Sequence, residues 1–268
     1  MKRVKGLFKS MMGLLLGGFL VTSCQSEDFS APIQAEGKGT ITLDLNAMAG
    51  FETETKAVNE ADYRDISNYT VEITDMNQIK TTYNTSELQS LVLPNGGYSL
   101  KAFYGEEKNA SQDVFYSVGT TSFNVHGETA DNPLAVSVTC KPTCAKVNVV
   151  FDDEMATYFD NYYVEYDTEK GSPVATWTKE NVNPWYLLVN KNGEEVTATI
   201  HLVAKETYKP TDNKVSIEKK YTLSPNKGWT LSVAPSYTPS NGSLGIEITI
   251  DETTDSVPVD IIIPAEWQ

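Results

Sequence analysis

Hydrophobic and polar residues alternate along much of this 268-residue chain. The pattern is strongest in the stretch Ala135–Phe151, AVSVTCKPTCAKVNVVF, where two alternating runs flank Lys141-Pro142-Thr143. Alternation with a period of two is typical of strands that bury one face. We therefore interpret Ala135–Phe151 as the joint between two β-domains.

Short alternating runs separated by polar turns fill most of the remaining chain. One helical turn is expected at Met155–Asp160, and residues 46–68 are expected to form a polar loop. Many short strands with polar turns between them are typical of β-sandwiches. The pattern predicts an all-β protein of two tandem Greek-key β-sandwiches, over residues 39–141 and 142–268. The expected strands are 41–45, 69–73, 91–93, 98–102, 115–118, 123–125 and 136–140, followed by 147–151, 162–166, 187–189, 196–202, 215–217, 229–233, 244–250 and 257–263.

Two turns share the pattern Pro-Asn-x-Gly-aromatic-Ser/Thr-Leu, at Pro94–Leu100 and at Pro225–Leu231, an offset of 131 positions. Proline presets φ for a turn, glycine admits a positive φ, and the aromatic residue begins the next strand. A tyrosine at such a corner can hydrogen-bond back to the turn. The same offset carries the strand 69–73 onto 200–204. The match indicates that the two halves are copies, although similar turn chemistry alone could produce it.

Residues 1–23 have the composition of a lipoprotein signal peptide. Met1–Lys9 is basic, and Met11–Val21 is apolar but too short for a membrane-spanning helix of about 20 residues. The ending Val21-Thr22-Ser23-Cys24 resembles the relaxed lipobox of Bacteroidetes lipoproteins, in which the cysteine is acylated, for example with palmitate. Acyl chains anchor a protein to a bilayer. An ordinary signal peptide followed by a chance cysteine is the alternative.

Residues 24–38 are interpreted as an acidic linker after the lipidated cysteine. Ser26, Glu27 and Asp28 look like the surface-export signal of Bacteroidetes lipoproteins, although a solvated tether would have the same composition. We expect a lipid-anchored outer-membrane protein at the cell surface. From Cys24 onward, 17 basic residues stand against 36 acidic ones, a formal net charge of −19. This charge repels phosphate backbones and therefore disfavours nucleic-acid binding.

Residue types that carry enzyme chemistry form no known catalytic motif. The histidines are His126, expected at a strand end, and His201, expected on the outward face of a strand. Asp152-Asp153-Glu154 lacks the alternating ligands and the glycine turn of a calcium loop, so we interpret it as a solvated loop, with one calcium ion as the alternative. Cys140 and Cys144 are expected to be buried free thiols, unless a bend between them permits a disulfide. We predict no catalytic residue, no metal site and no cofactor.

Aromatic residues gather in the first part of the second predicted domain. Trp177, Trp185 and Tyr186 could form a platform for a glycan, because aromatic rings stack on the apolar faces of sugars. Packing in the core explains the same residues and is the favoured interpretation. A carbohydrate-binding surface lipoprotein of a glycan-uptake system is therefore the alternative function.

The chain resembles the Bacteroidetes lipoprotein family of the uncharacterised domain DUF4493. The resemblance rests on the lipobox with its acidic followers and on the segments Leu93–Tyr98, Phe115–Gly119, Cys140–Val149 and Ile263–Trp267. It implies a pair of transthyretin-like or fimbrillin-like sandwiches, similar to the major fimbrial subunit superfamily. It further implies a non-catalytic structural or adhesion subunit, whose partners would be fimbrial subunits or a host or glycan ligand.

The same resemblance draws attention to Arg64. Fimbrillin-type stalk subunits are cut after an arginine, which removes a first strand and opens a groove for a neighbour's strand. Arg64 is the only arginine after Arg3, and it follows the first expected strand, 41–45. It is therefore a candidate processing site, with a plain solvated arginine as the alternative.

Overall fold

The computed structural model describes residues 36–48, 51, 58–85, 88–209, 211–238, 243–250 and 253–262. All of the described residues belong to one unit, residues 34–268. Cys24, the acidic residues Ser26, Glu27 and Asp28, and the Ile263–Trp267 segment lie outside the described residues.

Strands make up most of the described chain, which confirms the predicted all-β class. Short helical elements are also present: the 3-10 turns η1 (Glu60–Tyr63) and η2 (Ile66–Asn68) and the helix α1 (Met155–Tyr158). The strands are β1 (Lys38–Ala47), β2 (Thr70–Asp75), β3 (Lys80–Asn84), β4 (Leu91–Pro94), β5 (Gly96–Gly105), β6 (Ala110–Ser111), β7 (Tyr116–Val125), β8 (Leu134–Pro142), β9 (Cys144–Phe151), β10 (Phe159–Asp167), β11 (Ala175–Thr178), β12 (Trp185–Leu188), β13 (Glu194–Ala204), β14 (Lys214–Leu223), β15 (Gly228–Thr238), β16 (Ser243–Ile250) and β17 (Thr253–Ile262).

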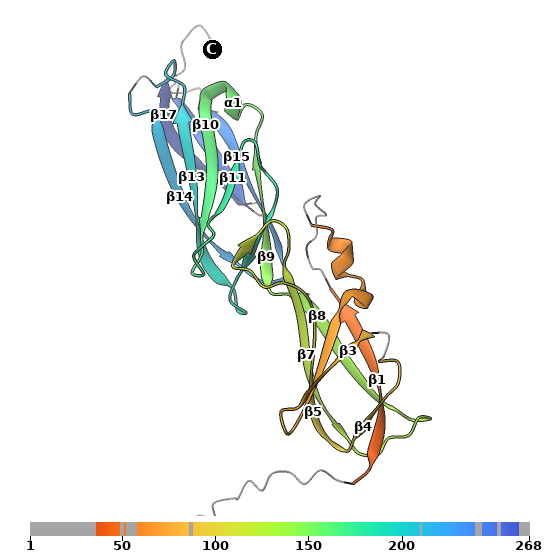
Figure 1. Ribbon diagram of the computed structural model, residues 1–268. Helices are drawn as coiled ribbons and strands as arrows, with labels where there is room; N and C mark the ends of the chain where they lie inside the picture. Colours follow the sequence, from red (N-terminus) through yellow and green to blue (C-terminus); the bar gives the residue numbers. More distant parts are fainter. Residues whose placement is uncertain are drawn as a thin grey trace, which may run out of the picture. The chain divides into compact units, whose positions relative to one another are not determined.

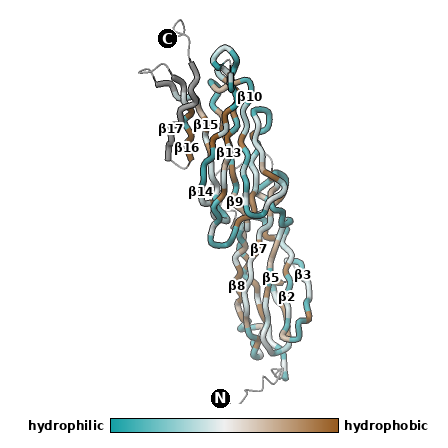
Figure 2. Tube along the Cα trace, turned by 90° about the vertical axis from the view of Figure 1, so that its left-hand side faces the viewer, coloured by the Kyte–Doolittle hydropathy of each residue, from teal (hydrophilic) through white to brown (hydrophobic). Residues whose placement is uncertain are grey.

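The first sandwich is one sheet with the strand order β3-β2-β5-β7-β8-β1-β4 (Figure 1). β7 and β8 pair over only two residue pairs, so the sheet divides there into the halves β3-β2-β5-β7 and β8-β1-β4. Hydrophobic and hydrophilic positions alternate along these strands (Figure 2). The inward positions of both halves therefore form one core, which includes Ile41, Val71, Leu100, Val125 and Val136.

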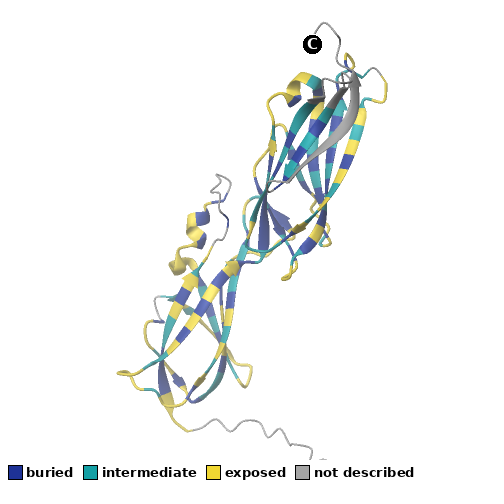
Figure 3. Cartoon of the chain, turned by 180° about the vertical axis from the view of Figure 1, so that it is seen from behind, coloured by how far each residue is buried: buried dark blue, intermediate teal, exposed yellow. Residues whose placement is uncertain are grey.

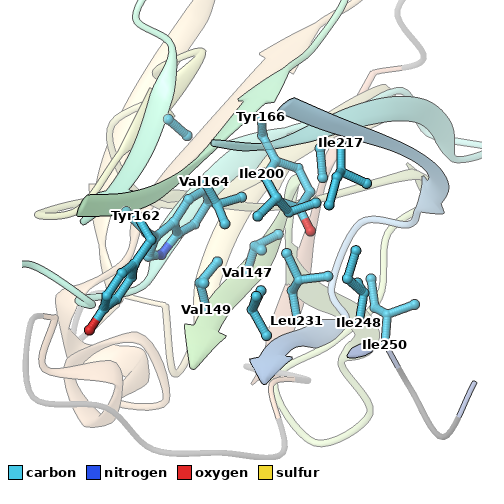
Figure 4. Packing of buried hydrophobic residues seen from close by; sticks show 14 of the residues in the cluster. Val147, Val149, Tyr162, Val164, Tyr166, Ile200, Ile217, Leu231, Ile248 and Ile250 are labelled. Atoms are coloured by element: carbon cyan, nitrogen blue, oxygen red, sulfur yellow. The ribbon is translucent and has the colours of Figure 1, made fainter. Parts of the chain in front are cut away.

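The second sandwich has two sheets, β11-β10-β13-β14 and β17-β16-β15-β9-β12-β6. Buried and exposed residues alternate along their strands, as the colours of Figure 3 show. Between the sheets, Val164 and Ile200 face Val147, Leu231 and Ile248 across the core (Figure 4). The predicted pair of β-sandwiches is thus confirmed.

Both sandwiches repeat one topology. β1 pairs in parallel with β8 and antiparallel with β4, just as β9 pairs in parallel with β15 and antiparallel with β12. β2 lies between β3 and β5, as β10 lies between β11 and β13. β5 then pairs with β7 as β13 pairs with β14.

The sequence alignment at an offset of 131 is nevertheless wrong. It superimposes β2 on β13 and β5 on β15, whereas the topology matches β2 with β10 and β5 with β13. The two Pro-Asn turns lie at non-equivalent corners, between β4 and β5 and between β14 and β15. The two turns also differ in geometry, because the residue with positive φ is Gly96 (φ 152°), the third of the pattern, in the first turn and Asn226 (φ 60°), the second of the pattern, in the second turn. The predicted corner bond is present in the first turn, where the Tyr98 hydroxyl donates to the Pro94 carbonyl at 2.8 Å.

Most expected strands are present, but three details differ from the prediction. β7 is one strand rather than two, because Gly119 continues it where a Cβ would lie 2.5 Å from the Thr139 carbonyl oxygen. β3, β6 and β11 were not expected, since β3 is polar and largely exposed and β6 and β11 are only two and four residues long. The expected polar loop at 46–68 contains η1 and η2, and its described part includes four buried residues. These are Phe51, Val58, Glu60 and Tyr63.

Core packing in the first sandwich predicts a large difference between two matched truncations. Leu100→Ala removes a side chain that is 1% exposed and should lower the free energy of unfolding by about 2–5 kcal/mol. Val92→Ala, at a position 57% exposed, should change it by about 0.5 kcal/mol or less. Urea unfolding followed by circular dichroism measures both. Equal effects of the two changes would contradict the assignment of the core.

Candidate functional site

The joint between the sandwiches contains a third buried cluster, which we call the joint cluster. It draws residues from the loop before β2, from the position just before β7, and from β9 and β12. β8 ends at Pro142 and β9 begins at Cys144, so these elements meet where the chain passes from one sandwich to the other. The cluster consists of Phe51, Val58, Tyr63, Phe115, Cys144 and Tyr186.

A charge pair lies at the centre of this apolar surface. The Lys146 ammonium lies 2.7 Å from Glu60 Oε1, and the two side chains are 0% and 2% exposed. The Tyr186 hydroxyl donates to the same carboxylate oxygen at 2.8 Å. Glu60 Oε2 has no hydrogen-bond partner among the described residues. Because a buried charge is stable only when it is paired, the carboxylate depends on Lys146 and Tyr186.

Aromatic rings exclude water from the pair. The Phe115 ring stacks on Tyr63 at 3.6 Å between centroids and on Tyr186 at 4.8 Å. Phe51 meets Phe115 edge-on at 5.4 Å, and the Lys146 ammonium lies 5.7 Å from the centre of the Phe51 ring. An ammonium at this distance is attracted by the ring electrons, so Phe51 adds to the binding of Lys146.

Tyr63 attaches the loop to the first sandwich. Its hydroxyl donates to the Phe115 carbonyl at 3.0 Å and accepts from the Phe115 amide at 3.1 Å, and burial raises its pKa to about 12. The Tyr69 hydroxyl donates to the Tyr63 carbonyl at 2.8 Å. Gly105, with φ +83°, permits the close approach, because a Cβ there would lie 1.9 Å from the Phe115 carbonyl oxygen.

A short strand from the first half of the chain also enters the second sandwich. Residues 110–111 form β6 at the edge of the six-stranded sheet, where they pair with β12. The Asn109 side-chain amide donates to the backbone carbonyls of Lys170 and Ser172 at 3.1 Å each. The joint is therefore built from two crossing segments, the loop before β2 and the loop that contains β6, in addition to the β8–β9 connection.

Arg64, the candidate processing residue, is exposed and lies between η1 and η2. Its amide donates to the Ala61 carbonyl at 3.0 Å. The Asp65 carboxylate accepts the amide of Ser67 at 2.9 Å and caps η2. The arginine thus lies in a compact turn whose neighbour Tyr63 is anchored in the joint cluster.

The structure contradicts the candidate glycan platform. Trp177 and Tyr186 are 0% and 1% exposed, so their ring faces are not accessible to a sugar. Trp185 packs partly buried against the core, and its Nε1 donates to the Thr176 carbonyl at 3.1 Å. The aromatic residues pack in the cores, which was the favoured interpretation, because the start of β12 and the inward face of β11 bring them there.

Cys140 and Cys144 are buried free thiols, as predicted. Burial raises the pKa of Cys140 to about 12, and burial also raises that of Cys144. The Cys140 thiol donates to the Ala102 carbonyl at 3.4 Å in the first core, whereas Cys144 belongs to the joint cluster. The two residues face different cores, which explains why they do not pair.

His201 has polar neighbours that the sequence did not reveal. Its Nδ1 lies 3.1 Å from the Ser216 hydroxyl, and its Nε2 lies 3.3 Å from Glu165 Oε2 without hydrogen-bond geometry. The ring stacks on Tyr163 at 4.4 Å. Tyr163, His201 and Ser216 are direct cross-strand partners on β10, β13 and β14. The arrangement follows from the strand register and stabilises the outer face of this sheet.

Other candidate chemistry is limited in the described part of the chain. His126 and residues 152–154 are exposed, as expected of a strand end and a solvated loop. Within the described ranges, no three His, Cys, Asp or Glu side chains are grouped so that they could hold a metal ion. None of the described helices has the length and apolar character needed to cross a membrane. A cavity of about 540 Å³ is lined by Val118, Pro142 and Leu188 together with Lys141, Lys191 and Glu107.

Sequence reasoning missed Glu60 and Lys146. The loop at 46–68 is rich in acidic residues, which hid the one carboxylate that is buried in its described part. Lys146 was the better signal, because it is a lysine in the middle of the hydrophobic run Cys144–Phe151. A charged residue in a strand that is buried on both faces requires a partner.

The buried Glu60–Lys146 pair predicts that two lysine substitutions lower the free energy of unfolding by different amounts. Lys146→Met leaves the Glu60 carboxylate buried without a counter-ion and should lower the free energy of unfolding by about 3–5 kcal/mol. Lys80→Met breaks the surface pair with Glu72 and should cost about 1 kcal/mol or less. Chemical denaturation of both variants provides the comparison. A mild effect of Lys146→Met would show that the carboxylate is not buried in solution.

Thiol chemistry gives a second prediction. Because burial raises the pKa of both thiols, and that of Cys140 to about 12, neither is a thiolate at pH 8.5. Iodoacetamide should therefore leave Cys140 and Cys144 unmodified in the native chain and modify both after denaturation. Peptide mass spectrometry locates the label. Rapid modification of either residue in the native chain would contradict its burial.

The chain was compared with proteins of known sequence and structure. No curated protein matches it. Among solved structures, the fimbrial anchor protein Mfa2 from Porphyromonas gingivalis is 11% identical, with 82% of this chain and 99% of that chain covered and a TM-score of 0.40. A fimbrial assembly protein from Parabacteroides distasonis is 12% identical, with 82% and 99% covered and a TM-score of 0.36. TM-scores of this size do not establish a shared fold.

The family models give a clearer result. The model described as "Domain of unknown function (DUF4493)" matches residues 37–265, which include both sandwiches and the joint between them. The Leu93–Tyr98 corner, the Phe115–Gly119 segment and the Cys140–Val149 joint all lie inside the match. The chain therefore belongs to the DUF4493 family.

Proposed function

We propose that the protein is a surface-anchored lipoprotein that acts, without catalysis, as a fimbria-like structural or adhesion subunit. Residues 39–141 and 142–268 would be its two domains. Cys24 would carry the lipid, and Ser26, Glu27 and Asp28 would direct the chain to the outer face of the outer membrane. The tether from Cys24 to β1 then spans 13 residues, so the first sandwich lies near the bilayer.

The observation that carries this proposal is the position of β1. The strand lies between β8 and β4, which do not pair with each other, and it is the strand next to the tether. It contributes Ile41 and Leu45, which are 1% and 8% exposed, to the first core. Removal of β1 would leave two rows of unpaired backbone groups above an apolar groove, which is the kind of surface that a strand of another subunit fills.

Arg64 remains the proposed processing site of this subunit. It lies after β1 and before β2, so a cut there separates β1 from the remainder of the first sandwich. Its exposed position supports the proposal. The proposed partners are accordingly other fimbrial subunits, with a host or glycan ligand at the end of such an assembly.

The test is an unheated denaturing gel of outer-membrane material from the native host, probed with an antibody to the mature chain. A ladder of multimers that collapses on heating, with palmitate label lost in a Cys24→Ala variant, is the expected result. A single unlipidated monomer, absent from fibres sheared off the cells, would contradict the proposed function.

A further inference from the structure

Arg64 is exposed, but the backbone around it is not free to extend. Tyr63 is stacked on Phe115 at 3.6 Å and hydrogen-bonded to its backbone through two bonds. On the other side, the Asn68 side-chain amide donates to the Asp62 carbonyl at 2.9 Å and closes the two 3-10 turns on each other. A folded protein is cut mainly through local opening, so cleavage here requires that this whole segment leaves its place.

That opening must break contacts with the second sandwich. Glu60 lies four positions before Arg64, and its carboxylate is bound by Lys146 of β9 and Tyr186 of β12 at 2.7 and 2.8 Å. An extended segment around Arg64 would pull Tyr63 out of the joint cluster and Glu60 away from Lys146. Lys146, which is 0% exposed, would then be left without this counter-ion.

We propose that the folded second sandwich protects the bond after Arg64 from proteolysis, and that the Glu60–Lys146 pair holds the segment in its protected conformation. We call this pair the latch. The inference rests on the proposed processing at Arg64 and adds its regulation. A protease of arginine specificity can cut the chain only while the second sandwich is unfolded or undocked from residues 58–69. A subunit in which both sandwiches are folded and docked would therefore resist such a protease.

The latch can be tested with the purified full chain and an arginine-specific protease, because Arg3 and Arg64 are its only sites. The rate of cleavage after Arg64 is measured by mass spectrometry, with a synthetic peptide of residues 58–70 as the unprotected reference. The wild-type chain should be cut at least about 100-fold more slowly than the peptide. Lys146→Met should raise the rate by about 100-fold or more, because loss of one partner of a buried pair favours the open state strongly.

Three controls separate the latch from general instability. Lys80→Met, which breaks a surface pair, should leave the rate unchanged. The double variant Glu60→Gln/Lys146→Met removes both charges and should be cut more slowly than Lys146→Met alone. If Lys146→Met does not fold, Tyr186→Phe, which deletes one hydrogen bond to Glu60, should still raise the rate about tenfold.

A wild-type chain that is cut as fast as the peptide would overturn the proposal. A folded Lys146→Met or Tyr186→Phe chain that is cut at the wild-type rate would overturn it as well. Because the measurement uses purified protein, it can contradict the latch even if host cells process Arg64. It can also support the latch even if the chain never enters a fimbria. The latch and the proposed function are therefore tested separately.

Discussion

A lysine and a glutamate that are both removed from water hold the loop of the first sandwich against the second. Lys146 lies in β9, the first strand of the second sandwich, and Glu60 lies in a loop of the first. The Glu60 carboxylate is not stable in the apolar joint without Lys146, so the loop can dock in this position only when β9 is in place. The aromatic rings of Phe51, Phe115 and Tyr186 then have a fixed surface on which to pack. The pair thus determines where the loop before β2 lies.

The repeated topology explains why segments outside the repeated strands connect the two sandwiches. Each sandwich has a first strand held between a parallel partner and an antiparallel one, and this arrangement buries most of its own core. Ala110 of β6, from the first half of the chain, adds to the core of the second sandwich. Two segments that are not part of the repeated topology make contacts between the sandwiches. They are the loop before β2 and the strand β6. The features that join the halves are therefore the ones in which the halves differ.

Alternation was sufficient to predict the class and most strands, because one buried face per strand is what a sandwich requires. β3 was missed because its residues are exposed on both faces, and β7 was divided in two because Gly119 and its polar neighbours look like a turn. The alignment of the halves failed since turn chemistry repeats at corners that are not equivalent. Trp177 was correctly weighed as a core residue. Glu60 could not be singled out, because only tertiary contacts distinguish it from the other acidic residues of its loop.

Hydrogen exchange in the native full chain, followed by mass spectrometry at increasing low concentrations of denaturant, tests the central claim most directly. If the buried pair fastens the loop to the second sandwich, the amides of η1 and those of β12 should open together, with the same free energy and the same dependence on denaturant. If η1 exchanges freely like a solvated loop while β12 remains protected, Glu60 is not held by Lys146, and the buried pair does not join the sandwiches.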